Sequence, residues 1–168
     1  MTYQQTIESP KIKPSDIADY FISLSNASGG LITNLKLQKL VYYTQAWYLA
    51  VFKKEIFDED FQAWIHGPVL PSLYGTYCCF KWKPIIREDL NYESIKGLSS
   101  KFSEELNAII ADVTEEYFVM DAYALERATH DEMPWKLARK GLSADEPSSN
   151  PIQKKDMIEY YSQFVITE

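Results

Sequence analysis

The chain has 168 residues, the length of one ordinary domain, and its 24 Asp and Glu against 17 Lys and Arg give a net charge of −7. Hydrophobic residues make up 46% and charged residues 24%, which excludes a disordered chain and indicates a folded, soluble one. The acidic balance argues against non-specific nucleic-acid binding, which needs many cationic side chains to neutralise phosphates. A membrane span is also excluded, because the longest apolar run, residues 46–52, is far shorter than the ~20 residues a spanning helix needs.

Two features of the sequence, its N-terminal segment and its cysteines, indicate the cellular compartment. The segment Met1–Gln5 carries neither the basic nor the apolar region of a secretory signal. The two cysteines, Cys78 and Cys79, are adjacent in sequence and cannot form an ordinary bridge across a fold. We therefore predict a protein of the reducing cytoplasm. Between Tyr77 and Phe80, both cysteines are expected to be small core residues of a helix rather than reactive thiols.

An amphipathic helix is expected to open the folded part of the chain. Residues 1–13 carry no apolar pattern, so we predict a flexible lead-in before a single domain over residues 14–166. Pro14 and Ser15 are typical of a helix start, because the Ser15 hydroxyl can accept a hydrogen bond from a free backbone N–H group. Apolar residues then recur at helical spacing until the glycines of residues 28–30 end the helix.

The strongest helical pattern follows Thr33 and Asn34, either of which can cap it. Its apolar face keeps a 3.6-residue period for more than three turns. This face consists of Leu37, Leu40, Val41, Thr44, Trp47, Tyr48 and Val51. Tyr42 and Tyr43 widen the face, so we predict that this helix lies at the centre of the core.

The middle of the chain breaks the helical pattern. Residues 56–65 alternate apolar and acidic side chains, which predicts a turn and a short strand. Two prolines and a glycine within residues 66–71 predict a tight corner, after which Pro71 opens a short helix. A second short strand is expected at residues 84–88, around two isoleucines.

The last third of the chain returns to helical spacing. We predict one helix over residues 99–117 and a further one capped by Asp121. Pro134 at a first helical position and Gly141 as a stop define another, and residues 150–151 begin the last. The expected fold is mainly α, a single compact domain of about six or seven helices with a minor β element.

Only two histidines, His66 and His130, are available for acid–base or metal chemistry. Glu126 and His130 are four apart on a predicted helix, with Glu132 close by, so they could bind a metal or move a proton. We favour the structural interpretation, in which His130 closes a helix by bonding a backbone carbonyl or a nearby acid. The chain also lacks a nucleophile elbow and a phosphate-binding glycine loop. We therefore predict no catalytic residue, no metal and no cofactor.

The 24 aromatic residues, 14% of the chain, are open to two interpretations. They can form a bulky core, or some of them can anchor a protein interface.

Two stretches of the chain resemble a known family. The first comprises Leu35–Leu49, Phe57–Phe61, Ala63–Val69 and Leu73–Tyr74, and the second comprises Leu125–Glu126, Thr129–His130, Glu132, Pro134–Trp135 and Ala138–Arg139. In this order and at this separation they are similar to the Panacea domain, also called the SocA-like or GepA-like family of phage and mobile-element proteins. The resemblance extends over residues 14–164. The family often has an aromatic residue before the Gly-Pro pair, where this sequence has His66.

The resemblance implies an antitoxin that neutralises a cognate toxin protein, encoded beside it, by direct binding. The SocA branch of the family implies in addition an adaptor that delivers its toxin to a ClpXP-type protease. Neither role requires catalysis. The remaining alternatives are the enzyme described above and a phage or mobile-element regulator that binds a host protein.

The family-motif positions carry structural or partner-binding roles by resemblance. They are Trp64, Gly67, Pro68, Tyr74, Glu126, Thr129, His130, Pro134, Trp135 and Arg139. We expect Gly67 and Pro68 to form a turn that only these residues fit, and Trp135 to be a core anchor. His130 and Arg139 are expected to face a groove shared with Glu126 and to tie the last helices together.

Overall fold

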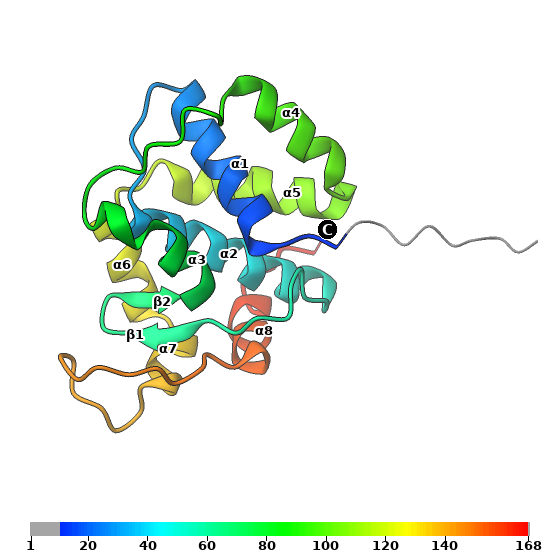
Figure 1. Cartoon of the computed structure of the whole chain (residues 1–168). Coiled ribbons are helices and arrows are strands. Elements are labelled where there is room, and N and C mark those ends of the chain that lie inside the picture. Colours follow the sequence, from blue (N-terminus) through cyan, green and yellow to red (C-terminus); the bar gives the residue numbers. More distant parts are fainter. Residues whose placement is uncertain (1–10, 168) are drawn as a thin grey trace, which may run out of the picture.

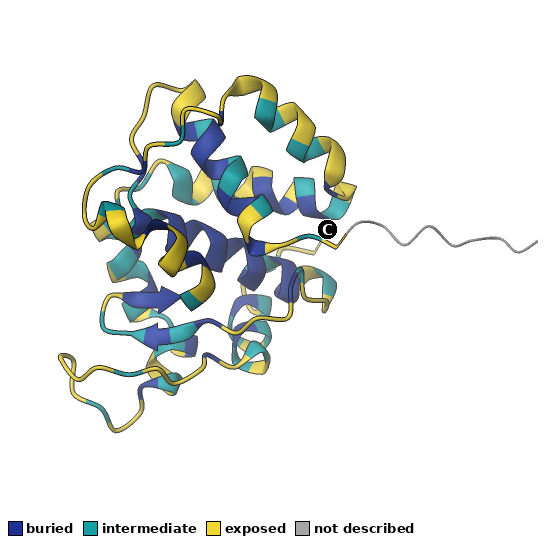
Figure 2. Ribbon diagram, in the orientation of Figure 1, coloured by how far each residue is buried: buried dark blue, intermediate teal, exposed yellow. Residues whose placement is uncertain are grey.

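A single helix, α2 (Asn34–Phe52), runs through the middle of the fold and is buried along nearly its whole length (Figure 1; Figure 2). It is the helix that the sequence predicts most strongly, and the Thr33 hydroxyl caps it by accepting from the backbone N–H of Lys36 at 3.2 Å. In the computed structural model, which describes residues 11–167, helices α1, α3, α5, α6 and α8 and strand β2 all pack against this helix. A helix buried on all sides is typical of the centre of a core.

The mainly helical fold and the minor β element are confirmed, with eight α-helices within residues 11–167. The α-helices are α1 (Pro14–Ala27), α2, α3 (Pro71–Tyr77), α4 (Tyr92–Lys101), α5 (Glu104–Val113), α6 (Ala122–Asp131), α7 (Met133–Ala138) and α8 (Lys154–Ser162). The strands β1 (Gln62–Trp64) and β2 (Gly67–Val69), a 3₁₀ turn η1 (Cys78–Phe80) and a π-helix η2 (Thr114–Phe118) complete the set. Most of the flexible lead-in predicted for residues 1–13 lies outside the described residues.

The elements form layers on either side of α2 (Figure 1). Helix α1 packs between α2 and α4, and α5, α6 and α8 pack directly on α2. The hairpin β1–β2 lies on the opposite side of α2 from α4, with β2 against α2 and α6. No helix within residues 11–167 has the length and apolarity needed to cross a bilayer.

The second strand lies elsewhere than predicted. It is β2, which pairs antiparallel with β1 so that Gln62 faces Val69 and Trp64 faces Gly67. The segment predicted as a tight corner is therefore a turn followed at once by a strand. Residues 84–88 form no strand, because Pro84 has no N–H to donate and only an isolated bridge to Thr33 is made there.

Two helix boundaries also differ from the prediction. The single helix expected over residues 99–117 is broken at Phe102, because the Ser103 hydroxyl caps a new helix by accepting from the N–H of Leu106 at 3.1 Å. The last helix begins at Lys154 rather than at residues 150–151. Pro151 instead forms an isolated antiparallel bridge with Gln62, so the chain runs beside β1 before the last helix begins.

The N-cap of α1 and the end of α7 shift by a few residues. Lys13, not Ser15, caps α1, and its backbone N–H donates to the Asp16 carboxylate at 2.8 Å. Helix α7 ends at Ala138, ahead of Gly141, whose φ of +86° marks a later turn. The prediction that Asp121 caps a helix is confirmed, whereas Pro134, predicted at the first helical position, is the second residue of α7, after Met133.

The prediction that Cys78 and Cys79 are core residues is wrong. Both thiols are exposed, because they lie in the 3₁₀ turn η1 rather than on the buried face of α3. The apolar neighbour that does enter the core is Tyr77.

Candidate functional site

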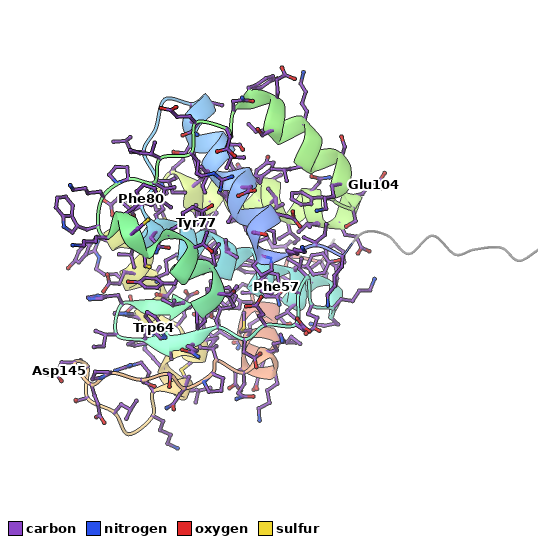
Figure 3. The ribbon with its side chains drawn as sticks, viewed as in Figure 1. Phe57, Trp64, Tyr77, Phe80, Glu104 and Asp145 are labelled. Carbon is purple, nitrogen blue, oxygen red and sulfur yellow. The ribbon has the colours of Figure 1, made fainter. Side chains whose placement is uncertain are left out.

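A groove of about 890 Å³ opens between the β1–β2 hairpin, helix α3 and the first turns of α2. We call it the aromatic groove, because Trp64, Tyr74 and Trp82 line it. Figure 3 shows Trp64 on the hairpin, with Tyr77 and Phe80 of the neighbouring α3–η1 segment. A cavity of this size falls within the range of ligand and peptide sites.

The aromatic side chains of the groove are held by the hairpin and by α3. Trp64 and Tyr74 meet edge to face, with ring centroids 4.9 Å apart. The Trp64 indole N–H donates to the Gln62 side-chain oxygen at 2.8 Å. Trp82, in contrast, is 79% exposed, which is rare for so large an apolar side chain unless it contacts a partner.

Two buried amides of α2 form the floor of the aromatic groove. The Gln38 amide donates to the Asn34 side-chain oxygen at 3.0 Å and accepts from the backbone N–H of Leu70 at 2.9 Å. Asn34 in turn donates to the carbonyl of Tyr74 at 3.2 Å. These bonds fix α3 and the end of β2 against α2, so the groove is formed before any partner arrives.

One side-chain hydrogen bond crosses the edge of the aromatic groove. His66 Nδ1, on the hairpin turn, lies 2.9 Å from the Glu126 carboxylate of α6. The His66 side chain is 71% exposed and that of Glu126 only 15% exposed. Glu126 therefore joins α6 to the hairpin and presents little charge of its own to a partner.

Gly67 makes the closest approach in the hairpin. It has a φ of +100°, and a Cβ there would lie 2.7 Å from Lys39 Cε and 2.8 Å from the Thr129 hydroxyl. Lys39 is fully buried beneath it and donates to the carbonyl of Pro68 at 3.0 Å. Burial lowers the pKa of Lys39 to about 7, and the nearby Glu126 carboxylate opposes that shift.

Trp135 contacts three other motif residues, Trp64, His130 and Arg139. Its ring stacks on His130, with centroids 4.0 Å apart, and its indole N–H donates to the carbonyl of Trp64 at 2.9 Å. The Arg139 guanidinium lies over the Trp135 ring, 5.1 Å from its centre. Cation–π contacts of this kind stabilise a partly buried arginine.

Arg139 is buried and bonds to backbone rather than to an acid. Its guanidinium donates to the carbonyls of Ala63 at 2.9 Å, Ser143 at 3.0 Å and Glu146 at 2.6 Å. These charge-assisted bonds fasten the loop after α7 to strand β1. Among the described residues Arg139 makes no hydrogen bond to Glu126, and of the three residues expected to face one groove, His130, Arg139 and Glu126, only Glu126 lines the aromatic groove.

The fold does not assemble the acid–base or metal set considered from the sequence. Glu126 pairs with His66, whereas Glu132 accepts a hydrogen bond from the hydroxyl of Tyr43. His130 Nε2 is buried without a hydrogen-bond partner among the described residues. Within residues 11–167, no three His, Cys, Asp or Glu side chains lie close enough together to hold a metal ion.

Glu132, the N-cap residue of α7, lies instead in a cluster of tyrosine side chains. Tyr43 donates to it, and Tyr117 stacks on Tyr43 with ring centroids 3.9 Å apart. Burial raises the pKa of Glu132 to about 7, against which the hydrogen bonds from Tyr43 and Tyr161 act. The same carboxylate, together with burial, raises the pKa of Tyr43.

This shift gives a pH dependence of stability with a definite sign. The unfolded chain releases the Glu132 proton near its ordinary pKa of 4.5, whereas the folded chain keeps it up to about pH 7. The free energy of unfolding therefore falls as the pH rises from 4.5 to about 7, by at most about 3 kcal/mol. In Glu132→Gln this contribution is expected to vanish. Urea unfolding of both proteins at about pH 5 and about pH 7.5 measures it.

The difference between the two proteins isolates Glu132 from other titrating groups. Burial also lowers the pKa of His130, so its contribution to the free energy of unfolding rises with pH. This contribution is the same in wild type and variant. The folded form of Lys39 loses its proton around pH 7, whereas the unfolded chain keeps it, so Lys39 also raises stability with pH, again equally in wild type and variant. Equal pH profiles for wild type and Glu132→Gln would contradict the assignment.

The site also depends on Asn34, Gln38 and Lys39, of which only Asn34 was named from the sequence, and then as a possible helix cap. All three are polar and buried on the central helix α2. In the sequence they can be recognised as polar residues on a helix that is predicted to lie at the centre of the core, where no side of the helix faces solvent. Buried polar groups need partners, and here those partners are the backbone of the hairpin and of α3.

Comparison with known proteins identifies the family. The profile of the family described as "Antitoxin SocA-like, Panacea domain" matches residues 37–136. The protein "Antitoxin SocA" of Caulobacter vibrioides (strain NA1000 / CB15N) is 33% identical over 67 residues, which cover 40% of this chain and 36% of that relative. The aligned part is thus little more than a third of the curated relative's length, and no solved structure matches. The hairpin and most of the lining of the aromatic groove fall inside the matched residues, and the chain belongs to the antitoxin SocA-like, Panacea-domain family.

Proposed function

We propose that this protein is a cytoplasmic antitoxin that neutralises a cognate toxin protein by binding it directly in the aromatic groove. The observation that carries the proposal is the exposed aromatic lining, above all Trp82, in a groove lined mostly by residues of the family region. Tryptophan and tyrosine supply most of the binding energy at protein interfaces, because they bury a large area with few rotatable bonds. The name of the Caulobacter relative supports the same role.

The groove is suited to binding without rearrangement. Asn34 and Gln38 already bond to the backbone around it, and His66 and Glu126 are joined by a hydrogen bond at its edge. A preformed site loses little conformational entropy on association, which favours tight binding. Binding of this kind requires no reaction, so we propose a non-enzymatic protein.

We further propose that the functional domain extends beyond the matched residues to 14–166. Helix α1 packs on α2, and α8 makes the most extensive contact of any element with α2. Tyr161 of α8 contacts the rings of Tyr42 and Tyr43 in the core. A chain cut at residue 136 therefore lacks part of its core.

The test is expression of the neighbouring reading frame in a host, alone and with this protein. Growth arrest by the neighbour alone, rescue by co-expression and co-purification of a stable complex are the expected results. Rescue in a host that lacks the ClpXP-type protease separates direct neutralisation from delivery to that protease. A harmless neighbour that does not co-purify would contradict the proposal and favour a regulator of a host protein.

A further inference from the structure

A second groove, of about 600 Å³, lies at the other end of α2. It is bounded by Trp47 and Val51 of α2, by α5, by the π-helix η2 and by the segment 164–166 after α8. It shares no lining residue with the aromatic groove. Gln38 and Trp47, the nearest residues of α2 that line the two grooves, are nine residues apart, which is about 14 Å along the helix axis.

The walls of this second groove are apolar and exposed. Val51 is 40% exposed, Phe164 56% and Ile166 90%. Ile109 and Val113 of α5 are buried below them and form the floor. Exposed apolar side chains gathered around one groove indicate an interaction surface rather than a solvated one.

The rim of the same groove is acidic. Asp112, Glu115 and Glu116 line it, all three are exposed, and none takes part in an ion pair within the described residues. No Lys, Arg or His lines the groove. We therefore call it the acidic groove. The electrostatic complement of such a surface is a segment that carries cationic side chains beside apolar ones.

The π-helix holds this rim in place. Within Thr114–Phe118, Glu115 and Glu116 are exposed, whereas Tyr117 packs inward on Tyr43 and accepts a hydrogen bond from the Trp47 indole at 2.9 Å. Segments of π-helix are rare and are frequently found at functional sites. Here the segment fixes two carboxylates at the edge of an apolar groove by anchoring the residue that follows them.

We infer that the acidic groove binds a short amphipathic helix of a second protein, with apolar side chains in the groove and Lys or Arg against Asp112, Glu115 and Glu116. An amphipathic helix laid into a hydrophobic groove is a common mode of peptide recognition. The inference goes beyond toxin neutralisation, because a partner at this site leaves the aromatic groove free. One chain can thus hold two proteins at once.

Binding of a designed peptide to the full chain tests the inference. The probe is a peptide of about 18 residues with Leu on one helical face and Lys on the other, and the counter-probe has Glu in place of Lys. Titration calorimetry, together with the fluorescence of the tryptophans, is expected to show saturable one-to-one binding of the Lys peptide and none of the Glu peptide. The binding is expected to weaken at high salt.

Variants of the groove give the decisive comparison. The triple variant Asp112→Asn, Glu115→Gln, Glu116→Gln is expected to bind the Lys peptide at least ~10-fold more weakly, and Val51→Lys is expected to abolish binding. All four positions are exposed, so circular dichroism spectra should stay unchanged. The matched control replaces Glu88, Glu93 and Asp145 by their amides, which changes the net charge equally outside the groove.

Several results would overturn the inference. Equal weakening by the control triple variant would show that only net charge matters, and equal binding of the Glu peptide would remove the charge complementarity. A dimer in sedimentation that Val51→Lys dissociates would make a second copy of the chain the occupant. Undiminished binding by the groove variants would place the peptide elsewhere on the protein.

Discussion

Gly67→Ala is expected to lower the free energy of unfolding by about 3 kcal/mol. The residue has a φ of +100°, a conformation that costs an L-residue roughly 1–2 kcal/mol. Its new methyl group would also lie 2.7 Å from Lys39 Cε and 2.8 Å from the Thr129 hydroxyl, and overpacking of this kind costs typically 1–3 kcal/mol. Lys39 has no room to move away, because it is fully buried and bonded to the Pro68 carbonyl. Denaturant unfolding measures the change.

The matched control is Gly97→Ala, the same substitution in the exposed part of α4. A Cβ at Gly97 meets no atom within 4 Å, and alanine favours a helix over glycine by about 0.8–1.0 kcal/mol. This variant is therefore expected to be slightly more stable than wild type. A Gly67→Ala protein as stable as wild type would show that the hairpin can move off α2 without cost.

Trp82→Ala is expected to weaken toxin binding at least about 30-fold, which corresponds to about 2 kcal/mol. Trp82 lines the aromatic groove and is 79% exposed, so its loss removes contact area without disturbing the core. Tyr74→Ala is expected to act in the same direction, because Tyr74 also positions the ring of Trp64. Affinity is measured with the co-purified toxin, and rescue of growth gives the same comparison in cells.

Tyr92→Ala is the control for this loss of an aromatic ring. Tyr92 is 60% exposed on α4 and lines neither groove, so its variant should bind and rescue as wild type does. Full binding by both Trp82→Ala and Tyr74→Ala would place the toxin on another surface. Such a result would leave the antitoxin role intact but remove the aromatic groove from it.

The elements that the sequence predicted well are those specified by local patterns. Helix α2 carries a long apolar repeat behind the Thr33 cap, and both features act within one helix. The short strand within residues 56–65 was likewise visible in its alternation. The second strand was misplaced because Gly67–Val69 has the composition of a turn and becomes a strand only by pairing with Gln62–Trp64.

The candidate site was likewise predicted from the sequence only in part. The motif positions Trp64, Tyr74 and Glu126 were named from the sequence, and the structure brings all three to one groove. The partner of Glu126 was not foreseen, because His66 is 60 residues away and no local spacing connects them. Trp82 was also missed, since an exposed tryptophan looks no different in sequence from a buried one.

The sequence by itself determined a mainly helical domain, its central helix and its family, because helical periodicity, caps and motif order are properties of neighbouring residues. The tertiary structure decided which polar groups are buried, which thiols and rings are exposed, and which charges pair. Lys39 illustrates the reason, since its side chain loses contact with water only when β2 and α6 close over it. Burial and charge pairing depend on contacts between residues far apart in the chain, and these contacts exist only once the layers have packed.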